Sequence, residues 1–332
     1  MGRMDLLSNV INKTTGAVEG FCLVKSAAVK NNVKGADYLD LVLADAGGEV
    51  NAKLWDYSLA AHGSYAVGDV IKVRGTINVW KDTEQLKIDR IRHRTDSDAL
   101  DMSAIVATSP VDGEEMYAKI YAFAGGFSDP DLTMLTQYLL RTRHERIAVY
   151  PAALRLHHAE RCGLMFHTGT MLEVAKKIVE VYKPLYPELS PDLVYAGVIL
   201  HDVAKTEELE VSELGIATAY STRGQLMGHI NMGVSMVEQA AAELQLPEEL
   251  TTLVSHILLS HHGQPEFGSP KFPMFPEAEI VSTVDMLDAR MFEMYDALGA
   301  VEIGKFTERQ WSMDNRQLYR HGHGCTEKAF DR

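Results

Sequence analysis

The chain has 332 residues, of which 46% are hydrophobic and 23% are charged, and its formal net charge is −14. These values are those of an ordinary globular protein with room for two domains. The first residues, MGRMDLLSNVINKTTG, lack an apolar core segment, so we expect no signal peptide. The longest apolar runs, such as LVYAGVIL, are too short to span a bilayer. Cys22, Cys162 and Cys325 form neither an even disulfide set nor a CxxC motif, so we expect free thiols and a cytoplasmic protein.

The charge is divided unevenly along the chain. Residues 1–94 contain 13 Lys and Arg against 11 Asp and Glu, a net +2, and the remainder carries −16. Such an asymmetry indicates two different domains. An acidic domain can still act on phosphates if part of its negative charge holds metal ions.

The first domain reads as a small β-barrel. Short runs with alternating apolar residues, separated by Gly and Asp turns, predict antiparallel strands. The runs are residues 20–30, 38–45, 49–56, 69–80 and 84–92. Five strands in this length suit the OB-fold. We therefore predict an all-β OB-fold barrel over 1–100, an all-α helical bundle over 101–320, and a tail over 321–332.

Nucleic acid is the ligand that we favour for this barrel, because single strands are held by aromatic side chains and by Lys and Arg. The candidates are Phe21, Tyr38, Trp55, Lys34, Lys53 and Arg74, with Trp80 and Lys81 as further ones. Phe21 and Trp55 can also be read as core residues. An OB-fold can equally bind an oligosaccharide or a protein.

The helical domain carries potential metal ligands on otherwise apolar helix faces. His167, for example, shares a face with Met171 and Val174, because offsets of three, four and seven fall on one side of a helix. The inward-facing candidates are His167, the pair His201 and Asp202, His229, His261 with its neighbour His262, and Asp285.

A single histidine on such a face is usually a core residue with a backbone acceptor. Several on successive helices of one domain are better explained by a shared cation. Nitrogen and carboxylate ligands without thiolate suit Mn, Fe, Zn, Co, Ni or Mg. We assign His167, His201, Asp202 and Asp285 to one ion. A second ion would use His229 with one or both of His261 and His262, and Asp202 would bridge; one or two ions stay open.

Five more positions are ambiguous. His157 and His158 line the entrance or form a polar loop pair, His256 lies off the face of His261, and Asp288 either orients a ligand near Asp285 or is a capping or surface acid. Lys205, one helical turn after His201, suits a phosphate oxygen but can also be a solvated lysine.

The order H…HD…H…H…D resembles the HD-domain metal-dependent phosphohydrolases. The segments LVYAGVILHDVAKTEEL, YSTRGQLMGHINMG and LLSHHGQPEFGSPKF, with the strand-rich YLDLVLADAGGEVNAKLWD, are similar to the YhaM-type 3′→5′ exoribonucleases. The resemblance covers roughly residues 15–320. One departure is Ala204, where such motifs commonly have Gly.

The resemblance implies an OB-fold joined to an HD domain, and 3′→5′ hydrolysis of single-stranded RNA, with single-stranded DNA as a further substrate. It implies a divalent cofactor, with Mn²⁺ as first choice over Fe²⁺, Co²⁺, Ni²⁺, Zn²⁺ or Mg²⁺. We place Lys205, His229 and His261 among the catalytic residues, expect no membrane partner, and leave a homo-oligomer open. The alternatives are a phosphohydrolase of nucleotides or cyclic nucleotides, and a non-catalytic nucleic-acid binder.

Overall fold

The computed structural model describes residues 16–323 except 34, 46–47, 81–82, 96, 99, 101–104, 155–157, 213 and 266–267. The chain divides into two compact units. The first unit comprises Met1–Thr108 and Ser212–Thr218, and the second comprises Ser109–Val211 and Ala219–Arg332. This division lies a little beyond the predicted boundary at residue 100, and it assigns a short segment from the second half of the sequence to the first unit.

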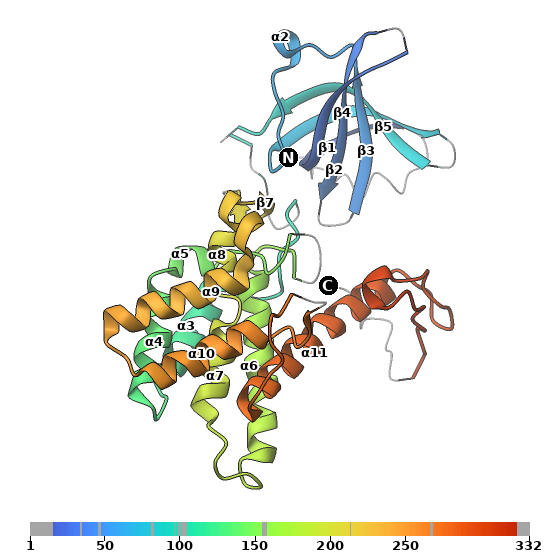
Figure 1. The fold of residues 1–332 in the computed structure, drawn as a ribbon. Coiled ribbons are helices and arrows are strands. Elements are labelled where there is room, and N and C mark those ends of the chain that lie inside the picture. The colour runs from blue at the N-terminus through green and yellow to red at the C-terminus, as the bar shows by residue number, and fades with distance from the viewer. Residues whose placement is uncertain are drawn as a thin grey trace. The chain divides into compact units, whose positions relative to one another are not determined.

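The first unit is a closed five-stranded barrel with the strand order β1-β2-β3-β5-β4, which is the OB-like arrangement (Figure 1). Its elements are β1 (Gly16–Asn31), β2 (Asp37–Asp45), β3 (Gly48–Trp55), α2 (Leu59–His62), β4 (Val70–Trp80) and β5 (Thr83–His93). Alternate residues such as Leu41, Leu43 and Leu86 fill the interior, as the period of two requires. The predicted strands and the barrel are confirmed.

The second unit is built mainly from helices that pack side by side around one apolar core (Figure 1). Its elements are α3 (Gly113–Ala124), α4 (Pro130–Arg141), α5 (His144–Ile147), α6 (Gly163–Tyr182), α7 (Pro191–Leu200), α8 (Lys205–Glu208), α9 (Thr222–Leu244), α10 (Glu248–Ser260), α11 (Pro276–Gly299) and the 3₁₀ helix η3 (Trp311–Met313). The helical region is therefore confirmed. A short two-stranded sheet, β6 (Leu209–Val211) with β7 (Ala217–Tyr220), follows α8 and was not predicted.

Two further expectations can be compared with the structure. Among the described helices, none is both long and apolar enough to cross a membrane. Cys22 and Cys162 are buried free thiols, as expected, whereas Cys325 lies outside the described residues.

Close packing of three helices brings the candidate ligands to one level of the bundle. Gly197 of α7 stands one helical turn before His201, and a methyl group there would lie 2.9 Å from Ile257 Cγ2 and 3.0 Å from Val281 Cγ2. Ile257 and Val281 in turn stand one helical turn before His261 and Asp285. Glycine therefore lets α7 approach α10 and α11 one helical turn before the positions of these ligands.

Candidate functional site

The predicted metal ligands of the helical unit lie together in its interior. His167 is within α6, His201 and Asp202 follow α7 directly, and Asp285 is within α11. These four side chains are buried, as is His261 at the end of α10. The sequence prediction that these residues face inward is therefore confirmed, and their role as metal ligands stays a prediction.

Four histidines are oriented in the same way toward a common centre. Each uses its Nδ1 atom for a hydrogen bond to an oxygen, which leaves Nε2 to face the other ligands. The pairs are His167 with Asp288 Oδ2 at 2.7 Å, His201 with the Val198 carbonyl at 2.7 Å, His229 with Glu208 Oε1 at 3.1 Å, and His261 with the Leu258 carbonyl at 2.7 Å. A set of imidazoles whose Nε2 atoms converge could hold a metal ion.

Asp202 lies at the centre of this set. Its Oδ2 atom is 3.4 Å from His201 Nε2, while its Oδ1 atom is 3.4 Å from His229 Nε2 and 3.9 Å from His261 Nε2. Asp202 Oδ1, His229 Nε2 and His261 Nε2 are all buried without a hydrogen-bond partner in the described part of the chain. A buried polar atom without a partner costs about 1–3 kcal/mol. One cation placed among these three acceptors would satisfy them together, so the residues present fit a metal ion.

His167, His201 and Asp285 form the other half of the centre. His167 Nε2 is 3.2 Å from His201 Nε2 and 3.2 Å from Asp285 Oδ1. Burial alone would lower the pKa of His167, but hydrogen bonds and negative charge from Asp285 and Asp288 outweigh it and raise the pKa to about 9. Without a metal, His167 therefore carries an additional proton between Asp285 and Asp288. A cation bound by His167 would replace that proton, so metal binding here would release it.

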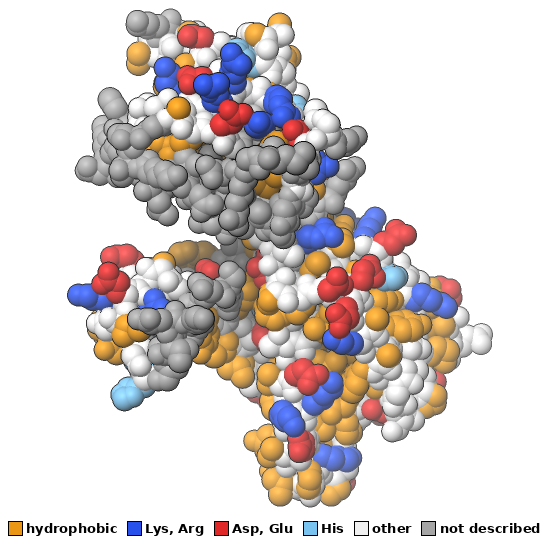
Figure 2. All heavy atoms as spheres, turned by 180° about the vertical axis from the view of Figure 1, so that it is seen from behind, with side chains coloured by type: hydrophobic (Ala, Val, Ile, Leu, Met, Phe, Trp, Pro, Cys, Tyr) orange, Lys and Arg blue, Asp and Glu red, His pale blue; other side chains and the backbone are white. Residues whose placement is uncertain are grey.

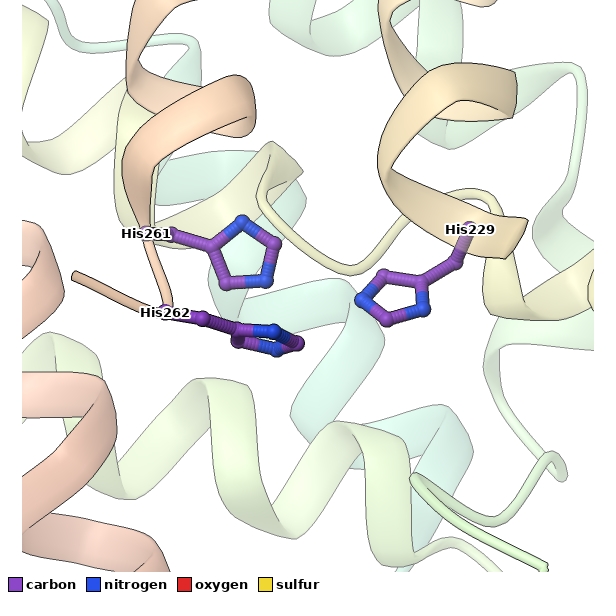
Figure 3. Close-up of side chains that lie close together, drawn as sticks. All are labelled: His229, His261 and His262. Carbon is purple, nitrogen blue, oxygen red and sulfur yellow. The ribbon is translucent and has the colours of Figure 1, made fainter. Parts of the chain in front are cut away.

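His229, His261 and His262 form a cluster at the edge of this centre, and Figure 3 shows their rings turned toward one another. Each offers a ligand atom, and these atoms lie within 4.8 Å of one another. Burial lowers the pKa of both His261 and His262, so both are neutral at neutral pH, as metal ligands must be. These are the residues assigned from the sequence to a second ion.

Lys205 is not a solvated lysine. Its side chain is only 10% exposed, and Nζ donates to the Ala152 carbonyl at 2.6 Å and lies 3.2 Å from Asp202 Oδ2. Burial by itself would lower the pKa of Lys205, but the carboxylates of Asp202, Glu208 and Asp285 raise it, so the ammonium stays charged. The same positive charge helps to hold the pKa of Asp202 well below its usual range, against the effect of burial.

The backbone before His229 departs from a regular helix. Gly228 has φ 68° and ψ 157°, a conformation that glycine adopts without strain, and it kinks α9. The freed backbone N–H of His229 donates to Glu208 Oε1 at 2.9 Å, which is the same atom that bonds the His229 ring. Ala204, by contrast, has φ −77°, which any residue adopts, so the departure from Gly at this position requires no unusual backbone.

The sequence reasoning missed one functional residue and left others ambiguous. Glu208 was not singled out; its only signal is a carboxylate within the HDVAKTEEL segment. His158 lies in a turn before α6, and it is buried with its Nε2 donating to Asp288 Oδ2 at 2.8 Å, so it is a buried turn residue and not a solvated one. Asp288 is buried as well and bonds His167, which favours its orienting role. His157 lies outside the described residues.

His256 does not belong to the centre. Its Nε2 accepts from the Met274 backbone N–H at 3.1 Å, and its ring lies against Phe275. This agrees with its exclusion from the predicted set.

Replacing Asp288 with asparagine should weaken metal binding by roughly 10- to 100-fold, the usual effect of losing a partner of a ligating histidine. Burial would raise the pKa of Asp288, but the bonds from His158 and His167 lower it to about 2, so a full negative charge is lost in the variant. The affinity can be measured by calorimetric titration of chelator-treated protein with Mn²⁺. Asp296→Asn, an exposed change on the same helix, is the control. Equal affinities of the two variants would contradict the orienting role.

The structure places the barrel residues predicted to bind nucleic acid in different surroundings. Tyr38 and Trp55 lie ring to ring with centroids 4.7 Å apart, and Lys53 Nζ lies 5.2 Å and 5.5 Å from their centroids. Trp55 is 37% exposed, so the interpretation of Trp55 as a core residue is wrong. Arg74 is an exposed residue of β4.

The structure corrects the prediction that Phe21 binds nucleic acid. Only 1% of it is exposed, because Leu23, Val70, Ile105 and Val106 pack around it in a small apolar cluster. It cannot stack on a base without unpacking that cluster, so the core interpretation holds. Lys34 and Lys81 lie outside the described residues, as does the side chain of Trp80.

A known protein family and several solved structures match parts of this chain. The HD domain family matches residues 165–290, a range that contains every predicted metal ligand. Three solved structures match the barrel region, each with a TM-score of 0.20. They are a replication protein A heterotrimer bound to ssDNA (15% identity; 24% of this chain and 59% of that one), the second OB-fold domain of replication protein A from Methanococcus maripaludis (18%; 26% and 89%), and a small single-stranded DNA-binding protein from Streptomyces coelicolor (22%; 24% and 90%). These TM-scores are too low to carry an argument about what this barrel binds.

The protein is thus an OB-like barrel followed by a helical region that contains an HD domain. The HD domain, with the buried His and Asp cluster, indicates a metal-dependent phosphohydrolase, which is a hydrolase.

Proposed function

We propose that this protein is a metal-dependent 3′→5′ exoribonuclease that hydrolyses single-stranded RNA to mononucleotides, with single-stranded DNA as a second substrate. The observation that supports it most concerns Asp202. Its buried Oδ1 atom has no hydrogen-bond partner among the described residues, and it faces the Nε2 atoms of His229 and His261. The YhaM-type resemblance supplies the substrate and the direction of attack.

The ligand set divides around the two oxygens of Asp202. His167, His201, Asp202 and Asp285 would hold one divalent ion, with Mn²⁺ as first choice, and His229, His261 and His262 would hold a second that shares Asp202. When bound, such ions lower the pKa of water toward about 7 and neutralise charge on phosphoryl oxygens. That chemistry is what phosphodiester hydrolysis at neutral pH requires.

The protein's own contribution is to fix charge and orientation. Lys205 has three N–H donors, and the Ala152 carbonyl and Asp202 account for two. Among the described residues no acceptor takes the third, which could therefore bind a non-bridging phosphate oxygen. Glu208 and Asp288 hold the rings of His229 and His167 so that their Nε2 atoms do not turn away. Burial of His167, His201, Asp202, His261 and Asp285 shields these side chains from bulk water and strengthens their interactions.

The barrel offers a site for the RNA chain. Tyr38 and Trp55 provide aromatic surface on which a base can stack, and Lys53 beside them can pair with a phosphate. Such a platform needs unpaired bases, since taking a base out of a duplex costs a few kcal/mol. This supports a preference for single strands.

The proposal is tested with 5′-labelled single-stranded RNA and added Mn²⁺, followed by separation of the products. We expect a ladder that shortens stepwise from the 3′ end, no activity with chelator, and a stop at the base of a hairpin. The decisive substrate carries a blocked 3′ terminus and should persist. If it is degraded as fast as the free strand, the protein is an endonuclease. If only free or cyclic nucleotides are hydrolysed, regardless of any attached chain, the protein is a small-molecule phosphohydrolase.

A further inference from the structure

A second group of cations lies on the outside of the barrel, over β1, β4 and β5. Strand register places Arg74 directly beside Glu19 on one side and Arg90 on the other, and the next row places Lys72 beside Phe21 and Arg92. These side chains surround a hollow of about 290 Å³, which is lined by Glu19, Lys72, Val73, Arg74, Arg90, Ile91 and Arg92. Figure 2 shows Lys and Arg side chains gathered on the barrel unit, with acidic side chains among them.

The charges of this basic hollow are only partly compensated. Lys72 pairs with Glu19 at 2.8 Å, and Arg92 forms two bonds with Asp98, at 2.7 Å and 2.8 Å. Neither Arg74 nor Arg90 has an ion pair within the described part of the chain. Like charges directly opposite each other on neighbouring strands are destabilising. In a chain whose net charge is −14, two facing arginines therefore indicate a surface built for an anion.

The hollow differs from the Tyr38 and Trp55 platform in its chemistry. No aromatic side chain of the described residues lines it, because Phe21 is buried beneath Lys72 and Arg92, whose cationic groups lie 5.6 Å and 5.7 Å from the ring centroid. Its described lining therefore offers no aromatic ring as a stacking platform, while guanidinium groups suit phosphate oxygens well. Such a surface contacts the sugar-phosphate backbone and does not require unpaired bases.

The two surfaces are joined by one further cation. Lys87 of β5 pairs in register with Lys53 of β3 on one side and with Thr76 of β4 on the other. Thr76 in turn follows Arg74 on the same outer side of β4. A nucleic acid held at the basic hollow can thus continue along positive charge to the aromatic platform.

We infer that the basic hollow is a backbone-binding site for nucleic acid that accepts paired as well as single-stranded regions, and that it is separate from base stacking on Tyr38 and Trp55. The inference rests on the proposed function, since it assigns to the barrel the part of an RNA substrate that the HD domain does not cleave. A duplex or hairpin region would be held here while its single-stranded 3′ end is shortened.

The test measures how the affinity of the full-length protein for RNA depends on salt. The variant Arg74→Gln/Arg90→Gln is compared with Lys119→Gln/Lys177→Gln, which removes the same charge from exposed lysines of the helical unit. Each arginine–phosphate interaction that the substitution removes should reduce the slope of log affinity against log salt by about 0.9 on a duplex and about 0.7 on a single strand. We therefore expect the slope of the arginine variant to fall by about 1.8 on a blunt RNA duplex and by about 1.4 on a single strand. Trp55→Ala should leave duplex binding unchanged.

Two results would overturn the inference. The first is that, on the RNA duplex, the slope of log affinity against log salt is the same for the arginine variant as for the lysine control. The other is a reduced slope on the single strand alone, which would place the arginines on the path of unpaired bases. Hydrolysis of a small phosphodiester, measured in the same preparations, reports on the proposed function separately. If the unaltered protein fails to hydrolyse it, the nuclease proposal falls while the slope result still decides the binding site.

Discussion

Replacing Asp202 with asparagine should reduce phosphodiester hydrolysis by about a thousandfold or more. Asp202 is the only side chain whose two oxygens face both halves of the described centre, His201 on one side and His229 with His261 on the other. Metal ions contribute several kcal/mol to stabilising charge in such reactions, and each 1.36 kcal/mol is a factor of ten in rate. Metal content per chain and turnover of a small phosphodiester are the two measurements.

Stability must be followed in the same experiment. The substitution leaves Lys205 buried beside a neutral side chain, and breaking a buried ion pair costs about 3–5 kcal/mol. Circular dichroism on heating separates unfolding from a folded protein that has lost its metal. Asp296→Asn on exposed α11 surface is the matched control and should behave like the unaltered protein. Near-normal turnover of the Asp202 variant with full metal content would mean that the site is misassigned.

Replacing both Tyr38 and Trp55 with alanine should weaken binding of long single-stranded RNA by about 10- to 100-fold. Base stacking on an aromatic side chain contributes about 1–3 kcal/mol per base, and about 1.4 kcal/mol is a factor of ten in affinity. Because the two rings lie in the barrel unit and the ligand set lies in the helical unit, we expect a higher KM for long RNA with kcat unchanged. Hydrolysis of a small phosphodiester should not change.

The control for this variant is Leu59→Ala, which removes an exposed apolar side chain from the same unit. A substitution in full-length protein is preferable to deleting the barrel, because Ile105, Val106, Leu214 and Ile216 pack with Phe21 and would be left exposed. Equal losses on long RNA and on the small substrate would show that the platform acts through the fold and not by holding RNA.

Much of the fold could be predicted because it depends on local periodicity. The alternation in residues 38–45 leads to β2, where Leu39, Leu41 and Leu43 all point into the barrel. The offsets of three and four around His167 likewise lead to its buried position in α6. The short sheet of β6 and β7 was missed because strands of three and four residues are too short to show a period.

The sequence by itself determined which residue types face inward, since side-chain direction follows from helix and strand periods that a one-dimensional pattern records. It thereby indicated a barrel, a helical bundle, and a buried His and Asp set.

Only the tertiary structure decided what each of these side chains contacts. Asp288 meets His158 and His167, each more than 100 positions away in the chain. Phe21 shares an apolar cluster with Ile105, and Leu214 packs against that cluster. Lys205 finds its acceptor at Ala152. Such contacts depend on how helices and strands pack in space, and the buried polar groups then pair with whichever partner that packing brings within reach.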